Sequence, residues 1–159
     1  TDTGRDVVGP LVLTRFADPM YIVMQPITWS PNASQRGAYK AVTVPVHFVT
    51  DFASIPRLFW SGLRPYGNYC YAAVIHDYLY WEQQVSRNTA DDIIGFAMAD
   101  FRVNRATIAA IKTAVQLGGG FAWDSNARLK SAGEKRLLKR LPDDPTTRWA
   151  DWKKRSDVF

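Results

Sequence analysis

The first third of the chain alternates short apolar stretches with turn formers. Residues 11–27 predict two short strands around a turn at Asp18-Pro19, because β-branched and aromatic residues lie on both sides of that pair. Residues 39–49 alternate apolar and polar side chains and predict a third strand, which contains His47. Pro45 indicates an edge or a bulge there, since proline donates no ladder hydrogen bond. We expect a small N-terminal antiparallel sheet.

The pattern becomes helical after an aromatic, turn-rich loop at residues 50–68. Residues 69–83 predict an amphipathic helix. A second helix is expected to begin at Asn88 or Thr89, whose side chains can cap its first amides, and to run to about residue 103.

Two further helices are expected in the last third of the chain. Asn104 is a suitable cap for a helix over residues 105–117, which Gly118–Gly120 should end. A basic helix is predicted near residues 126–141, closed by Pro142.

Strands first and helices afterwards predict the α+β class: a small N-terminal antiparallel sheet, followed by a helical half with an antiparallel helix pair. A chain of 159 residues fits one domain. We expect that domain to span residues 1–141, with residues 142–159 as a basic, tryptophan-containing extension.

The net charge of +5 is confined to the end of the chain. Residues 1–127 carry ten basic and ten acidic side chains, whereas residues 128–159 carry ten basic and five acidic ones. A basic tail indicates an acidic partner: nucleic acid, an anionic membrane or an acidic protein. The alternatives are a solvated terminal helix, or a tail that clasps its own domain or a neighbouring subunit. The candidate binding residues here are Trp149, Trp152, Lys153, Lys154 and Arg155.

Several classes of protein are disfavoured. Cys70 is the single cysteine, so no internal disulfide and no cysteine zinc cluster can form, and its apolar surroundings predict a buried thiol. The chain has no run of 18 or more apolar residues, so no transmembrane helix is predicted. The first 20 residues lack the basic stretch followed by an apolar stretch that is typical of a signal peptide.

The side chains that could take part in catalysis or metal binding occur near His76 in the sequence. On a helix, His76 and Tyr80 share one face, and Asp77 points about 100° away. If the next helix packs antiparallel, Asp91 can approach the imidazole, fix its tautomer and leave the other nitrogen to accept a proton. Asp77 would face a loop, where a carboxylate can hold Ca²⁺. A structural role for the His76-Asp77 pair is equally compatible with the pattern.

The loop before this helix offers alternatives. Asp51 either caps the following amides in a turn or lies beside His76 as an orienting group or ligand. Ser54 would be a nucleophile with His76 as its base, although the glycine-serine-glycine elbow is absent. A zinc site is a further alternative, with ligands drawn from the two histidines and two nearby aspartates: His47, His76, Asp51 and Asp77.

Two family resemblances involve these residues. VTDFASIPR (49–57), AAVIHDYLY (72–80) and Ala90-Asp91 resemble the signature of a phage and prophage family of unknown function, over roughly residues 40–120. The spacing of His76, Asp77 and Tyr80 resembles the active-site helix of phospholipases A2, secreted and viral. That resemblance implies His76 as general base, Asp77 as a Ca²⁺ ligand and Asp91 as the residue that orients His76.

The phospholipase pattern is incomplete in two places. Asp91 follows His76 by 15 residues, about two helical turns closer than in that family, and residues 64–69 hold one glycine where a glycine-rich calcium loop belongs.

Two functions are therefore expected. The first is a phage-associated accessory protein with a His/Asp site, a hydrolase of cell-envelope material acting on phospholipid or peptidoglycan. Its catalytic residues would be His76, Asp91 and Asp51, with Tyr80 as a binding residue and Asp77 as the ligand of Ca²⁺ or, less favoured, Zn²⁺. The second is a non-catalytic virion or tail component that binds other phage proteins. Both place the chain in the virion or in the host cytoplasm or envelope.

Overall fold

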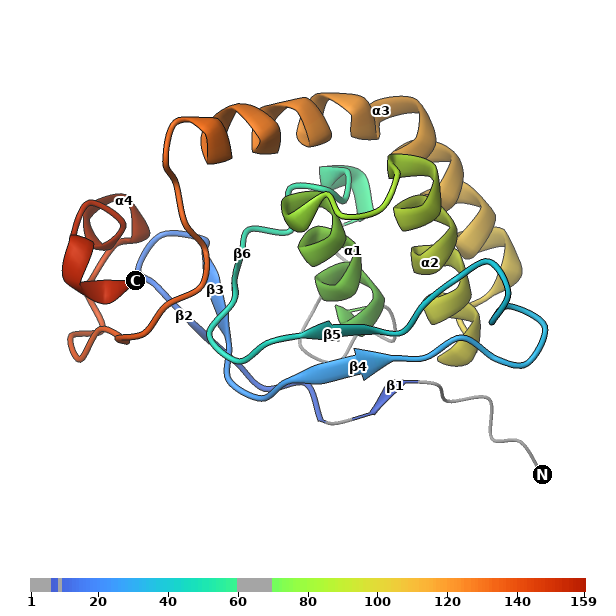
Figure 1. The fold of residues 1–159 in the computed structure, drawn as a ribbon, viewed down its shortest axis with the longest axis horizontal. Coiled ribbons are helices and arrows are strands. Elements are labelled where there is room, and N and C mark those ends of the chain that lie inside the picture. Colours follow the sequence, from blue (N-terminus) through green and yellow to red (C-terminus); the bar gives the residue numbers. More distant parts are fainter. Residues whose placement is uncertain (1–6, 9, 60–69) are drawn as a thin grey trace.

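The computed structural model describes residues 7–8, 10–59 and 70–159, and it has the expected α+β order (Figure 1). Two three-stranded antiparallel sheets occupy the N-terminal part. One has the order β1-β4-β5, from Val7–Val8, Ile27–Trp29 and Val42–Val44. The other has the order β2-β3-β6, from Leu13–Arg15, Tyr21–Val23 and Val49–Thr50.

The predicted strand positions are correct in part. The pair around Asp18-Pro19 is confirmed, because β2 and β3 pair there with Arg15 opposite Tyr21. The single strand predicted over residues 39–49 is wrong: the chain turns after Pro45, so β5 and β6 belong to different sheets. His47 lies in that turn with a φ of 72°, not in a strand, and its Nδ1 is 3.3 Å from the carbonyl oxygen of Leu138.

The first two predicted helices are present. α1 spans Cys70–Glu82 and α2 spans Arg87–Asp100. Ten of the thirteen α1 residues are buried, so α1 is a central helix rather than an amphipathic surface helix. The cap of α2 is Ser86, whose side chain accepts from the amide of Thr89, and neither Asn88 nor Thr89 caps it.

The third helix differs most from the expectation. α3 runs continuously over Arg105–Ser131, capped by Asn104 as predicted, and it passes through Gly118–Gly120 without ending. Figure 1 shows it curving along α2 and over α1. Glycine is tolerated in a helix where packing favours it, and Gly119 is buried against α1.

The basic helix predicted near residues 126–141 is also wrong. Residues 126–131 are the last turns of α3, and the following segment is extended, with Leu137 bridged to Phe48. The chain then forms α4, Trp149–Trp152, and a short 3-10 helix, Ser156–Val158.

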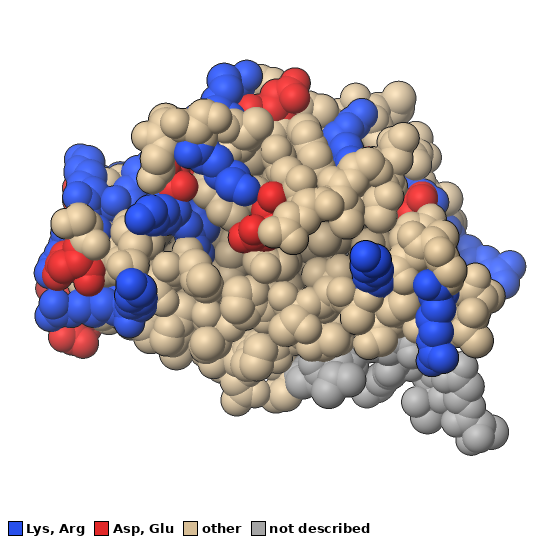
Figure 2. Space-filling model, in the orientation of Figure 1, with Lys and Arg blue, Asp and Glu red and all other residues tan. Residues whose placement is uncertain are grey.

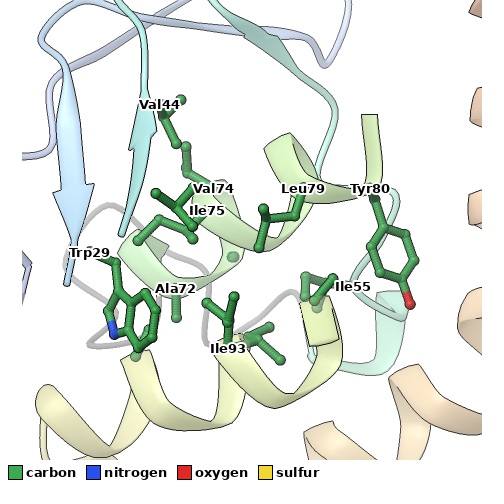
Figure 3. Packing of buried hydrophobic residues seen from close by; sticks show 14 of the residues in the cluster. Trp29, Val44, Ile55, Ala72, Val74, Ile75, Leu79, Tyr80 and Ile93 are labelled. Carbon is green, nitrogen blue, oxygen red and sulfur yellow. The ribbon is translucent and has the colours of Figure 1, made fainter. Parts of the chain in front are cut away.

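Two clusters of buried side chains hold the fold together. The larger packs α1 between the β4-β5 sheet and α2, and Figure 3 shows Trp29 and Val44 facing Val74 and Ile75 across it. The smaller joins the β2-β3 turn, β3 and β6 to the C-terminal residues and contains Phe16, Met20, Ile22, Val49, Leu138, Trp149, Trp152 and Val158. Cys70 is buried, as predicted.

Basic side chains gather on the side of the molecule where the C-terminal segment lies (Figure 2). Within the described part of the chain, no helix combines the length and the apolar character that a membrane crossing requires.

Candidate functional site

The three elements that converge at His76 place both of its nitrogens beside polar side chains. His76 projects from the middle of α1, and its Nε2 lies 2.8 Å from Oδ1 of Asp91 on α2. Its Nδ1 lies 3.1 Å from Oγ of Ser54, in the turn after β6. Tyr80, one turn further along α1, donates its hydroxyl to the same Asp91 oxygen at 2.7 Å. The result is a hydrogen-bonded relay: Ser54, His76, Asp91 and Tyr80.

The positions of the protons follow from this network. Burial lowers the pKa of His76, and the hydrogen bond to Asp91 only partly opposes it, so the ring is neutral at pH 7. Burial and the neighbouring Asp91 raise the pKa of Tyr80, which therefore donates to Asp91. With Oδ1 of Asp91 as the acceptor, Nε2 of His76 carries the proton. Its Nδ1 is then the basic nitrogen, and it faces Ser54.

Ser54 also contacts Asp77, the residue after His76 on α1. Oδ2 of Asp77 accepts from the hydroxyl of Thr50 at 2.5 Å. Burial raises the pKa of Asp77 to about 7, and the charge of Asp51 adds to that rise, whereas Arg136, Thr50 and Ser54 lower it. Asp77 is thus partly protonated near neutral pH, because desolvation outweighs its stabilising contacts.

The turn that carries Ser54 is tightly specified. Asp51 accepts from the amide of Ala53 at 2.8 Å, which is the capping role expected for an aspartate at that position. Phe52 has a φ of 56°, the left-handed region that bulky residues rarely occupy. Its ring packs edge-on against Tyr21 at 5.3 Å. Backbone strain of this kind is often retained at functional sites.

The relay is buried. His76 and Asp91 have no exposed surface, and Ser54 is 3% exposed. Oδ2 of Asp91 is buried and has no hydrogen-bond partner among the described residues. An ionisable pair in the core costs free energy unless its geometry is good, so its presence indicates a chemical or a specificity role.

The predicted site residues are only partly brought together. His76, Asp91 and Tyr80 are in direct contact, but Asp51 contacts the turn and Arg136, and no hydrogen bond joins it to His76. Asp77 neighbours Ser54 and Thr50.

The C-terminal candidates do not join the relay. Trp149 and Trp152 are buried in the second core, so they pack against their own domain. Lys153 pairs with Glu134 at 3.0 Å, Lys154 with Asp151 at 3.9 Å, and Arg155 with Asp157 at 2.7 Å. Arg155 also lies 4.7 Å above the ring of Trp152.

No three histidine, cysteine, aspartate or glutamate side chains within residues 7–8, 10–59 and 70–159 are arranged to hold a metal ion. His47, proposed above as a zinc ligand, lies against the carbonyl of Leu138. Asp51, another expected zinc ligand, pairs with the guanidinium of Arg136. Residues 64–69, compared above with a calcium loop, fall outside the described residues.

Sequence reasoning missed three contributors to this region. Thr50 binds Asp77, Gly119 makes room for Tyr80, and Arg136 approaches Asp51. Thr50 belongs to the VTDFASIPR motif, which was a usable signal. Gly119 and Arg136 come from elements distant in sequence, and no local pattern singles them out.

Comparison with known proteins places this site within a family. No curated protein and no solved structure matches the chain. One family model, described as a protein of unknown function (DUF1353), matches residues 27–115, which include Ser54, His76 and Asp91. Because the match covers more than half of the 159 residues, the chain belongs to the DUF1353 family.

Proposed function

We propose that this chain is a hydrolase that cleaves an acyl bond, an ester or an amide, in cell-envelope material, and that it serves a bacteriophage. The observation that carries the proposal is the engagement of both nitrogens of His76. One lies against a carboxylate and the other against a hydroxyl, at 2.8 and 3.1 Å. This is the arrangement by which a histidine activates a nucleophile.

Each residue of the relay then has a role. Asp91 holds the His76 ring and stabilises the charge that the ring acquires, and Tyr80 holds Asp91. His76 accepts the Ser54 proton at Nδ1 while the Ser54 oxygen bonds to the substrate carbonyl carbon. His76 then returns that proton to the leaving group, and water releases the acyl group from Ser54 by the reverse sequence.

The lowered pKa of His76 suits this role. A neutral imidazole at pH 7 is ready to accept a proton, whereas an imidazolium is not. The resemblance of the His76-Asp77-Tyr80 spacing to phospholipases A2 supports an ester-containing lipid as the first substrate to test. Peptidoglycan is the second, since envelope cleavage serves a phage in either case.

The test is hydrolysis by the full chain of phospholipid vesicles, purified peptidoglycan and short-chain nitrophenyl esters. His76→Asn should abolish turnover, with a loss of at least about a hundredfold. His47→Asn is the matched control and should leave turnover unchanged, since His47 lies in a turn outside the relay. A His76→Asn variant that keeps its turnover while remaining folded would overturn the proposal.

Ser54→Ala identifies the nucleophile. Loss of turnover comparable to that of His76→Asn supports Ser54, with Ser34→Ala as the control, because Ser34 is exposed in a loop. Retained turnover assigns the nucleophile to a water molecule at Nδ1 of His76.

The complete burial of His76 and Asp91 favours a second candidate, a non-catalytic virion or tail component. Here the relay would only specify the packing of α1 against α2. Leu117 and Phe121, 84% and 79% exposed and one turn apart on α3, would contact other phage proteins. In that case His76→Asn lowers stability, no substrate is cleaved, and Leu117→Ser with Phe121→Ser abolishes incorporation into particles.

A further inference from the structure

Arg136 is a buried cation that the fold holds rigidly near the relay. It is 4% exposed, and its guanidinium lies 4.3 Å above the ring of Trp81. Its Nε donates to Glu134 at 3.0 Å, and its carbonyl oxygen accepts from the amide of Val49 at 2.8 Å. The extended segment after α3 is thereby attached beside β6, and it carries Arg136 in a fixed orientation.

The guanidinium of Arg136 has two acidic partners in the described structure: Nε pairs with Glu134 at 3.0 Å, and Nη1 faces Asp51. Nη1 lies 3.5 Å from Oδ2 of Asp51 and has no hydrogen-bond partner among the described residues. Glu134 balances the charge at Nε, but the buried Nη1 faces the Asp51 carboxylate, so this second ion pair constrains where the Asp51 side chain can lie.

Asp51 uses its two oxygens for two different contacts. Oδ2 faces Arg136, while Oδ1 accepts from the amide of Ala53, the residue before Ser54. A continuous path therefore leads from Arg136 through Asp51 and Ala53 to the hydroxyl that contacts His76. The strained φ of Phe52 lies within this turn, which makes an external restraint necessary to keep its conformation.

We infer that Arg136 is a positioning residue of the relay: through its ion pair with Asp51, it holds the turn of residues 51–54 so that Ser54 faces Nδ1 of His76. The inference rests on the proposed function for its catalytic meaning. It also makes the segment after α3 part of the site, although that segment lies outside the residues that the family model matches.

The experiment compares Arg136→Met with Arg140→Met in the full chain. Methionine keeps the volume and the contact with Trp81 but removes the charge. Arg140 is the matched control, because it lies in the same segment, is exposed and pairs with Asp157. Two readouts need no substrate: hydrogen exchange of the Ala53 amide, and the ¹⁵N chemical shift of His76 Nδ1.

In Arg136→Met, exchange at Ala53 should accelerate on the order of tenfold, because the turn opens more often. The Nδ1 signal should move toward that of Ser54→Ala, since the hydroxyl no longer stays in place. Arg136→Lys should restore part of both effects, and Arg140→Met should produce neither. Asp51→Asn should reproduce the change at Nδ1 and add little to it in the double variant.

The inference is overturned if Ala53 exchange and the Nδ1 signal in Arg136→Met match those of Arg140→Met. Should Arg136→Met fail to fold, the same comparison is made with Arg136→Lys and Asp51→Asn. Failure of the hydrolase proposal is recognised separately, by turnover in His76→Asn, and leaves these two readouts interpretable.

Discussion

Gly119 of α3 lies directly against the hydroxyl of Tyr80 on α1. A Cβ atom at position 119 would overlap the hydroxyl oxygen and also approach the guanidinium of Arg87 at 3.4 Å. The absence of a side chain there lets the Tyr80 hydroxyl reach Asp91, while the Tyr80 ring belongs to the apolar cluster (Figure 3). A glycine in a third helix thus determines where a relay residue, Tyr80, can lie.

Gly119→Ala should therefore destabilise the protein, although alanine is the better helix former. The added methyl group must displace Tyr80, and overpacking of this kind costs about 1–3 kcal/mol. Chemical denaturation measures the change in free energy of unfolding.

Gly118→Ala is the matched control, one residue away in the same helix. Position 118 is exposed, and no atom lies within 4 Å of a Cβ there. This variant should gain up to about 1 kcal/mol from helix propensity. Equal effects of the two substitutions would contradict the role assigned to Gly119.

The ionisation of Asp77 should make stability depend on pH. Its pKa is raised from 3.8 to about 7 on folding, so between these values the folded state binds more protons than the unfolded state. The stabilisation that results from this proton uptake is complete below about pH 3.8 and is lost as the pH rises through about 7. Relative to Asp77→Asn, the wild type should gain stability on acidification across this window. Denaturation curves of both proteins at several pH values test this, and parallel pH profiles would contradict it.

His76 should produce the opposite dependence. Its pKa is lowered on folding from 6.5 because burial disfavours the imidazolium. Its contribution is present above pH 6.5 and is lost as the pH falls below that value, where the unfolded state binds the additional proton. Relative to His76→Asn, the wild type should lose stability on acidification. A histidine NMR titration gives an independent measurement, in which His76 should resist protonation below pH 6.5.

The C-terminal segment should contribute directly to global stability. Trp149 is 5% exposed, contacts Phe16 with ring centroids 5.5 Å apart, and its amide donates to Asp18 at 2.7 Å. Trp149→Ala should cost about 3–5 kcal/mol, as expected for a buried aromatic side chain. Leu117→Ala is the control and should change stability by less than about 0.5 kcal/mol, since Leu117 is exposed. Thermal melting of both variants distinguishes a docked segment from a loosely attached tail.

Local sequence patterns predicted the structure correctly where the contacts that stabilise it are also local. The turn at Asp18-Pro19, the helix at Cys70–Glu82 and the Asn104 cap follow from residue preferences within a few positions. The spacing of His76 and Tyr80 also defines one helical face, and from it Asp91 was selected as the partner.

Local patterns misled where tertiary packing outweighs propensity. Three consecutive glycines predict a helix end, yet α3 continues through them because Gly119 fits against Tyr80 and the Arg87 side chain bonds the carbonyl of Gln116 at 3.2 Å. The segment 134–140 is rich in residues that favour helices, but the β-bridge between Leu137 and Phe48 keeps it extended.

The amino-acid sequence by itself determined the α+β order, the helix that carries His76, and the residue types that can move a proton. Tertiary structure alone decided which of these residues meet. Ser54 reaches His76 because the 51–54 turn folds back onto α1, and Arg136 reaches Asp51 from 85 positions later because its segment pairs beside β6. Contacts between distant segments depend on how helices and sheets pack, and packing depends on the shape of the whole core rather than on any local pattern.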